Sequence, residues 1–181
     1  MGGGCIVDAV SQVSAGDYPC ISVAVMKTNH THDLMKKENR FALSVLGKKV
    51  APKIIQIFGM NSMRNLNKFQ MIPTQKEMEL PIIPDSLGYM ICEIIDSIDM
   101  DTHTLFIGKL IEADILQEGE AMSYGYYQDH KEDYVKVNTS CGKTAWICTA
   151  CGYIYYGEEI PQNFKCPQCG LDCSYFKKLD N

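Results

Sequence analysis

The sequence has no long apolar run and no excess of basic residues, and both absences narrow the possible functions. No stretch approaches the roughly 18 consecutive apolar residues of a membrane-spanning helix, and residues 1–4 do not begin a signal peptide. Lysine and arginine number 17 against 22 aspartates and glutamates, giving a formal charge of -5. This balance provides no electrostatic footprint for a phosphate backbone. We therefore expect a cytoplasmic protein that binds neither nucleic acid nor membrane.

Cysteine, by contrast, is abundant and odd in number. The chain has nine cysteines, and five of them lie between Cys148 and Cys173. Cytoplasmic thiols stay reduced, so this concentration favours metal ligation over disulfides. With 181 residues, 46% of them hydrophobic, the chain is expected to form one medium domain with a small appendage.

Most of the chain has the pattern of a mainly β domain with short helices. The expected strands are residues 20–26 and 40–46, followed by a hairpin of residues 89–98 and 104–115. The expected helices are residues 31–39 and 51–58, the second starting near Pro52 and ending at Gly59. The strands are too closely spaced for repeated βαβ units. A barrel or rolled antiparallel sheet is therefore predicted for residues 1–127.

The remaining residues divide into a connection and a small domain. Residues 128–143 are polar and charged with few apolar anchors, and we interpret them as a linker. Residues 144–181 are predicted to form a small metal-binding domain. So short a segment buries little apolar surface, so the metal should supply much of its stability.

The metal site is predicted by two Cys-x-x-Cys-Gly knuckles. The first contains Cys148 and Cys151, and the second contains Cys166 and Cys169. In each knuckle two thiolates converge on one ion, and the following glycine lets the backbone turn so that N–H groups point at sulfur. Two knuckles form a tetrahedral cage of four sulfurs. Cysteines packed merely as small hydrophobic residues are a much weaker explanation of this doubled spacing.

The spacing alone suits iron and zinc equally, because zinc ribbons share it. The surrounding sequence favours iron. Cys-Gly-Tyr-x-Tyr at 151–155, Gly-Glu-Glu-Ile-Pro at 157–161 and Phe-x-Cys-Pro-x-Cys-Gly at 164–170 resemble a short rubredoxin domain over residues 146–179. The resemblance implies a single iron held by four cysteines, and electron transfer as the function. It also implies an aromatic cluster beside the iron, made of Trp146, Tyr153, Tyr155, Phe164 and Phe176. Cys173 departs from the pattern and is interpreted as a packed or free thiol.

The strand-to-helix junction near residue 27 offers groups that suit a phosphate. Lys27, Thr28, Asn29 and Thr31 supply a positive charge, hydroxyls and helix N-terminal N–H groups. The alternative is that Asn29 or Thr31 simply caps the helix.

A second resemblance covers residues 4–127. Its segments include Gly-Cys-Ile-Val at 4–7, Asn-x-Thr-His at 29–32, Phe-x-Leu-Ser-Val-Leu at 41–46, Asn-x-Asn-Lys-Phe at 65–69 and Asp-Thr-His-Thr-x-Phe-Ile-Gly at 101–108. In this order they resemble the flavin reductase-like FMN-binding split-barrel family, in the branch fused to rubredoxin. Relative to that family, the domain is expected to be N-terminally shortened. The fold class expected is therefore a mainly β, FMN-binding split β-barrel followed by a small rubredoxin-like metal-binding domain.

The resemblance implies roles for particular residues. Lys27, Asn29 and Thr31 would bind the FMN phosphate. Arg64 and Lys68 would meet phosphate or pyrophosphate, and the alternative for these two is a solvated basic loop. The isoalloxazine ring would be lined by Val7, Asp8, Ala9 and Gln12, where Asp8-Ala9 replaces the usual Asn-Thr. His103 would face the flavin and the nicotinamide as the catalytic residue, its alternative being a turn histidine bonded to the backbone.

Together these resemblances imply an NAD(P)H-dependent flavin and rubredoxin oxidoreductase. FMN would take a hydride from NAD(P)H, and electrons would leave singly through the iron. By analogy the acceptor would be a flavodiiron or peroxide-reducing protein of an anaerobe, and the chain would form a homodimer. The alternative is a zinc-ribbon interaction module on a barrel that no longer binds flavin.

Overall fold

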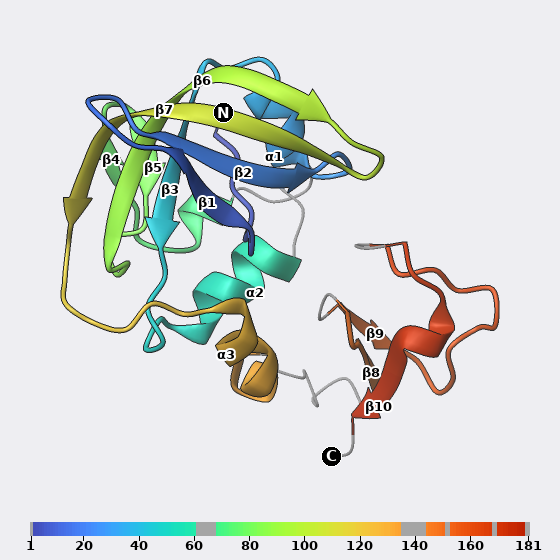
Figure 1. Ribbon diagram of the computed structural model, residues 1–181. Helices are drawn as coiled ribbons and strands as arrows, with labels where there is room; N and C mark the ends of the chain where they lie inside the picture. Colours follow the sequence, from blue (N-terminus) through green and yellow to red (C-terminus); the bar gives the residue numbers. More distant parts are fainter. Residues whose placement is uncertain (1, 61–67, 135–143, 151–152, 168–169, 180–181) are drawn as a thin grey trace. The chain divides into compact units, whose positions relative to one another are not determined.

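The computed structural model describes residues 2–60, 68–134, 144–150, 153–167 and 170–179 (Figure 1). Two compact units divide the chain, Met1–Asp129 and His130–Asn181. Within the described residues, no helix combines the length and the apolar composition that crossing a bilayer requires.

The first unit is built on a five-stranded antiparallel sheet in the order β1-β2-β7-β6-β3. The strands are β1 (Val10–Ser14), β2 (Cys20–Met26), β3 (Arg40–Val45), β6 (Gly88–Asp99) and β7 (His103–Ile115). The long β6–β7 hairpin and the strands β2 and β3 lie where the sequence pattern predicted them. A second hairpin, β4 (Gln75–Glu77) and β5 (Leu80–Ile82), forms a separate two-stranded sheet in this unit.

The core of the first unit lies on one face of the sheet. In β2, the alternate residues Ile21, Val23 and Val25 are buried, as the period of two along a strand requires. Val23 pairs with Phe106 of β7, and both side chains are 1% exposed. This β2–β7 pairing fixes the register of the centre of the sheet, because a slip of one residue would turn every buried side chain outward.

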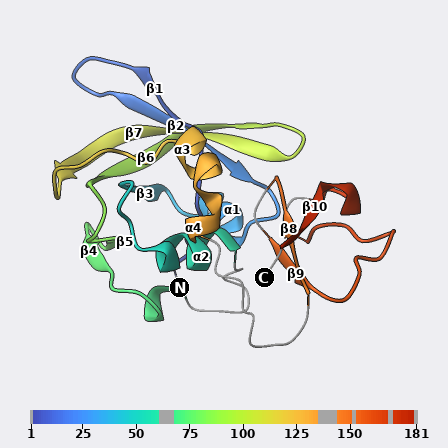
Figure 2. The ribbon, with the colours of Figure 1, turned by 90° about the horizontal axis from the view of Figure 1, so that it is seen from below.

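Two short helices accompany the sheet, as the two views of Figures 1 and 2 show, and a 3-10 turn follows them in sequence. Helix α1 (His30–Met35) follows β2 and buries His32 and Met35, which are three residues apart and so share one face. Helix α2 (Pro52–Met60) begins at the predicted proline. The turn η1 spans Lys68–Gln70.

The predicted end of α2 at Gly59 is wrong, because the helix continues to Met60. A Cβ on Gly59 would lie 3.4 Å from Ile6 Cγ1. This is an ordinary van der Waals distance, so a side chain would fit here, and Gly59 lies within the helix without ending it.

The N-terminal segment runs close against α1 and α2. A Cβ on Gly3 would lie 2.5 Å from Leu34 Cδ1, and one on Gly4 would lie 2.7 Å from the Phe58 ring. Both distances are shorter than a real side chain tolerates. The end of the Leu34 side chain could shift to admit a Cβ at position 3, whereas the buried Phe58 ring favours glycine at position 4. The segment thereby brings Cys5 and Val7 to the edge of the core, where both pack against the buried cluster of β2.

Helix α3 (Tyr124–Asp129) ends the first unit, and helix α4 (Lys131–Tyr134) begins the second. The second unit has a three-stranded antiparallel sheet in the order β10-β8-β9. Its strands are β8 (Ala145–Cys148), β9 (Ile154–Tyr156) and β10 (Phe176–Leu179), and η3 (Cys173–Tyr175) precedes β10.

The beginning of the segment predicted as a linker, residues 128–143, has regular structure. Residues 128–134 include the end of α3 and all of α4, and Tyr134 is only 5% exposed. The sequence did not predict α4, because a charged helix of four residues has almost no hydrophobic periodicity. The domain boundaries 1–127 and 144–181 remain predictions.

Candidate flavin and metal sites

The first cysteine of each knuckle is buried in one cluster of the second unit. Cys148 is fully buried, Cys166 is 2% exposed, and Phe176 completes the buried group. Cys148 N–H donates to Tyr153 O at 2.8 Å, and Cys166 N–H donates to Leu171 O at 2.7 Å. These two turns reverse the chain after each of the two cysteines, as a metal knuckle requires.

The predicted aromatic cluster surrounds these cysteines. Phe164 lies 4.7 Å from Tyr155 and 5.5 Å from Phe176, measured between ring centroids, and Tyr153 packs edge-on against Phe176. Trp146 packs against the same cluster and donates its Nε1–H to Gly157 O at 3.0 Å. The rings exclude water from the thiol groups, which suits a site whose potential depends on burial.

The remaining predicted ligands, Cys151 and Cys169, lie outside the described residues. Among the described residues alone, no three acidic, cysteine or histidine side chains group as a metal site. Gly170, which follows the second knuckle, has φ +76°, a conformation that glycine adopts without strain. Two buried thiols in one cluster, at the starts of matching turns, fit a soft ion such as iron or zinc.

Cys173 is separate from the two knuckles in its bonding. It is half-buried in η3, and its Sγ lies 3.4 Å from Gln162 O, to which the thiol donates. The geometry agrees with the interpretation of Cys173 as a packed thiol.

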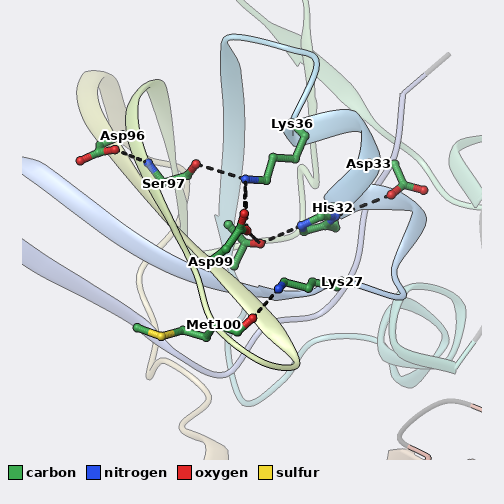
Figure 3. A network of polar contacts seen from close by, with 9 residues as sticks. Lys27, His32, Asp33, Lys36, Asp96, Ser97, Asp99 and Met100 are labelled. Atoms are coloured by element: carbon green, nitrogen blue, oxygen red, sulfur yellow. Dashed lines mark hydrogen bonds and ion pairs between the residues drawn. The ribbon is translucent and has the colours of Figure 1, made fainter.

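In the first unit, a chain of polar contacts joins α1 to the β6–β7 hairpin (Figure 3). The Thr104 hydroxyl is fully buried and donates to Asp99 Oδ1 at 2.6 Å. Its oxygen therefore accepts from His32, whose Nε2 lies 2.8 Å away. His32 also packs edge-on against Phe106, with ring centroids 5.8 Å apart. A histidine of α1 is thus fixed by both packing and hydrogen bonding.

Asp99 completes this chain at the surface. Lys36 Nζ lies 3.2 Å from Asp99 Oδ1 and 3.3 Å from Ser97 Oγ, as Figure 3 shows. The Thr104 hydroxyl, followed by the Lys36 ammonium, holds the pKa of Asp99 below its usual value. Sequence reasoning missed His32, Thr104 and Asp99 as a group. The available signal was the spacing of His32 and Met35, which places a polar residue on the buried face of α1.

Lys27, predicted to bind phosphate, holds the turn of the same hairpin. Its Nζ donates to Met100 O, and its backbone N–H donates to Thr102 O at 3.0 Å. Figure 3 shows Lys27 reaching this turn from the end of β2. The amine is therefore at the junction of α1 and the hairpin, where an anion would have to compete with a backbone carbonyl.

The other two predicted phosphate residues differ from each other. Asn29 is the N-cap residue of α1, yet its side chain makes no capping hydrogen bond. Asn29 therefore occupies the N-cap position, as the alternative expected, but its side chain does not make the capping bond. Thr31 instead faces the N-terminal segment. Burial raises the pKa of the Cys5 thiol there, and a hydrogen bond with the Thr31 hydroxyl offsets part of that rise.

The segment predicted to line the flavin ring lies at the edge of the sheet. Val7 packs against the core, whereas Asp8 and Ala9 are exposed. Ala9 O accepts from Ala24 N–H at 3.4 Å, and the Gln12 side chain donates to Ser14 O at 3.0 Å. The segment thus presents backbone and small side chains along β1.

His103, the predicted catalytic residue, is half-buried at the start of β7. Its Nδ1 lies 2.8 Å from Thr102 Oγ1, and its backbone oxygen accepts from Met100 N–H at 2.8 Å. The ring is therefore oriented by a neighbouring hydroxyl at the same turn that Lys27 holds. Arg64 lies outside the described residues.

Lys68 was missed as a buried residue. It is 2% exposed, and its Nζ donates to Gly4 O and Phe58 O, both at 3.1 Å. Burial lowers the pKa of Lys68 to about 8. This lysine joins the N-terminal segment to α2, so it is neither a solvated basic residue nor an open phosphate ligand.

Comparisons with known proteins identify both parts of the chain. Residues 2–134 match the family model of the flavin reductase like domain. The chain belongs to the flavin reductase-like family. Residues 146–177 match the rubrerythrin, rubredoxin-like domain, so the C-terminal part is rubredoxin-like. The two families imply a flavin and iron as cofactors, and an oxidoreductase that transfers electrons.

The chain is similar along almost its whole length to one curated protein of the same two-part kind. The high molecular weight rubredoxin of Moorella thermoacetica is 29% identical over 205 residues, covering 97% of this chain and 89% of that protein. A ferric-chelate reductase (NAD(P)H) of Archaeoglobus fulgidus is 27% identical over 109 residues, covering 59% of this chain and 64% of the relative.

Solved structures confirm the fold expected for the first unit. An NADH:FAD oxidoreductase of Streptomyces globisporus superposes with a TM-score of 0.59 at 23% identity, covering 67% of this chain and 77% of that chain. An FMN-binding protein from Thermus thermophilus superposes with a TM-score of 0.55 at 24% identity, covering 63% of each chain. The mainly β, split-barrel prediction is therefore confirmed at the level of fold.

Proposed function

We propose that this chain transfers electrons from NAD(P)H, through FMN on the flavin reductase-like domain, to a single iron held by Cys148, Cys151, Cys166 and Cys169. The observation that carries the proposal is the presence on one chain of a flavin reductase-like domain and a pair of cysteine knuckles whose first cysteines are buried together. A flavin accepts a hydride as an electron pair and releases electrons one at a time, while an iron with four thiolate ligands carries one. That difference gives a reason for joining the two domains.

The residues of the first unit have separate roles in this proposal. Asn29, with its side chain unused for capping, and Lys27 supply a donor and a charge for the FMN phosphate. The backbone of residues 7–12, including Asp8 and Ala9, lies beside the flavin ring. His103 orients the nicotinamide, with its own ring orientation fixed by Thr102. Thr31 supports the site indirectly by binding Cys5.

A homodimer is proposed on the outer face of the sheet. Leu105 and Ile107 alternate with the core residues Thr104 and Phe106, so they face away from the core. Beside them on β6, Ile95 and Ile98 are 55% and 46% exposed. These apolar side chains lie on one side of the sheet, with Asp96 and Ser22 beside Ile107, and we infer that they form the interaction surface. Sedimentation of the parent and of an Ile98→Glu variant tests the dimer, which the variant should weaken.

The electron acceptor is proposed to be a soluble redox protein, of the flavodiiron or peroxide-reducing class, in the cytoplasm of an anaerobe. The matches to the flavin reductase-like and rubredoxin-like families favour this function over a zinc-ribbon interaction module. Both families imply a redox cofactor, and a protein that only binds a partner would need neither cofactor.

Absorption spectroscopy under anaerobic conditions tests the proposed function. The protein is reconstituted with ferrous iron and FMN, oxidised to the red ferric form, and mixed with NADH or NADPH. We expect the ferric absorption to bleach only when FMN is present. A protein that takes up no flavin, or whose red colour persists with NAD(P)H but bleaches with dithionite, contradicts the proposed route. Zinc in place of iron after both metals are offered supports the interaction module.

A further inference from the structure

A lysine from outside the two knuckles contacts the backbone of the first one. Lys131 Nζ donates to Thr149 O at 3.0 Å and lies 3.4 Å from Cys148 O. Cys148 is the first predicted iron ligand, and Thr149 follows it directly. The ammonium group of Lys131 is therefore held at the backbone of the ligand knuckle by two carbonyl oxygens of adjacent residues.

This lysine belongs to the second unit in structure, although it precedes the rubredoxin-like match in sequence. Lys131 is the first residue of α4, and the unit begins at His130. The rubredoxin-like match covers only residues 146–177. The contact therefore adds a residue of the predicted linker to the environment of the metal site.

A fixed positive charge at this position has a definite electrostatic consequence. Four thiolates give a ferric site about one net negative charge, and uptake of one electron raises this to about two. A nearby cation stabilises the more negative, ferrous state more strongly than the ferric state. Its presence raises the reduction potential, which makes the iron a better acceptor for electrons from a reduced flavin.

We propose that the positive charge of Lys131 raises the reduction potential of the iron, so that this residue acts on the iron without being one of its ligands. The inference rests on iron occupying the four-cysteine site of the proposed function. It does not depend on FMN, so its failure is distinguishable from a failure of the flavin half of that function. The electron that the ferric site gains comes from reduced flavin in the proposed function and from dithionite in the test.

The rival explanation is that Lys131 only satisfies two backbone carbonyls and stabilises the knuckle. Three variants of the full chain separate charge from hydrogen bonding. Lys131→Gln keeps a hydrogen-bond donor and removes the charge, whereas Lys131→Arg keeps both. Lys178→Gln removes the charge of an exposed lysine on β10 and serves as the matched control.

The measurement is the reduction potential of the iron-loaded proteins, by spectroscopic titration with dithionite and mediators, without added flavin. At a fixed solution potential, Lys131→Gln should lower the ferrous-to-ferric ratio roughly three- to tenfold, where tenfold corresponds to 59 mV for one electron. Lys131→Arg and Lys178→Gln should retain the parent potential. Melting temperature and iron content are recorded for every variant.

A Lys131→Gln potential equal to that of the parent overturns the proposal and leaves a structural role only. An equal fall in Lys131→Arg and Lys131→Gln also overturns it, because charge is then not the cause. If Lys131→Gln fails to retain iron, Lys131→Met is measured at low temperature directly after reconstitution, with the same expectation. If the parent chain takes up no iron, that result contradicts both this proposal and the iron site of the proposed function.

Discussion

His32 Nε2 lies 2.8 Å from Thr104 Oγ1, and this contact joins α1 to the hairpin that carries His103. Thr104 directs its single hydroxyl hydrogen to Asp99, so the threonine is both acceptor and donor in one buried chain. Lys27, which lies between β2 and α1, donates a hydrogen bond to Met100 O in the turn of the same hairpin. Lys27, one of the predicted phosphate residues, and His103, the predicted catalytic residue, thereby lie at the same hairpin turn.

Replacing Thr104 by valine should destabilise the first unit. The substitution preserves shape but leaves the buried Nε2–H of His32 without an acceptor, which costs about 1–3 kcal/mol. Urea denaturation of the full chain, followed by circular dichroism, measures the loss. Thr104→Ser should restore most of it, and Thr28→Val at an exposed threonine provides the control. Equal stability of Thr104→Val and Thr28→Val would show that the chain of contacts contributes nothing.

The strands β2, β3, β6 and β7 were predictable because their hydrophobic patterns are strong, whereas β1, whose residues are all exposed, was not. Residues 104–115 match β7 to within one residue, since β-branched and apolar residues fill both faces of this central strand. The polar chain from His32 to Asp99 was not predictable in the same way. Its members are far apart in sequence, and only the β2–β7 and β6–β7 registers bring them together.

The knuckles show what spacing can and cannot predict. Doubled cysteine spacing predicted the ligand set, and the burial of Cys148 and Cys166 agrees with it. The contact of Lys131 with the first knuckle could not be predicted, because it is made to backbone carbonyls, which have no sequence signature. The contacts of Lys68 could not be predicted for a related reason, since it donates to the carbonyls of Gly4 and Phe58.

Loss of Cys148 and loss of Cys173 should have opposite effects on the iron. Cys148→Ser removes a buried thiol that we propose as an iron ligand, so the red ferric absorption should disappear and the small unit should lose its metal-dependent stability. Cys173→Ser removes a thiol that bonds only Gln162 O among the contacts described, and the spectrum should be unchanged. Absorption spectra and iron-to-protein ratios provide the measurement. A colourless Cys173→Ser protein would contradict the assignment of ligands.

Stability of the first unit should depend on pH through Lys68. Its folded pKa is about 8, below the ordinary value of 10.5, because burial disfavours the ammonium. Between these values the unfolded chain binds the proton that the folded chain has lost, so this contribution makes stability rise with pH. Below about pH 8 both states are protonated and the full penalty of burial is present.

The comparison of parent and Lys68→Met isolates this contribution. From pH 7.5 to 9.5, the unfolding free energy of the parent should gain about 1–2 kcal/mol relative to the variant, because one proton contributes at most about 1.4 kcal/mol per pH unit. The lost hydrogen bonds to Gly4 and Phe58 shift the variant by an amount that does not vary with pH. Lys53→Met, at an exposed lysine, should follow the parent. A constant difference between parent and Lys68→Met would rule out the lowered pKa.

Removing the charge of Lys27 should weaken FMN more than riboflavin. The two ligands differ by the phosphate, and a charge-assisted hydrogen bond to phosphate contributes more than a neutral one. Binding must also draw the amine from Met100 O, which offsets part of the gain. We therefore expect Lys27→Met to lower FMN affinity roughly five- to twentyfold, corresponding to about 1–2 kcal/mol.

Calorimetric titration of both ligands measures this difference directly. Riboflavin affinity should change less than twofold, because the proposed ring contacts along residues 7–12 are untouched. Lys49→Met supplies an exposed-lysine control. The hairpin turn loses its Lys27 contact in the variant, so a general loosening of the site would weaken both ligands in equal proportion. Equal losses would therefore assign Lys27 to the hairpin alone. An FMN-specific loss assigns it to the phosphate, since only that group distinguishes the two ligands.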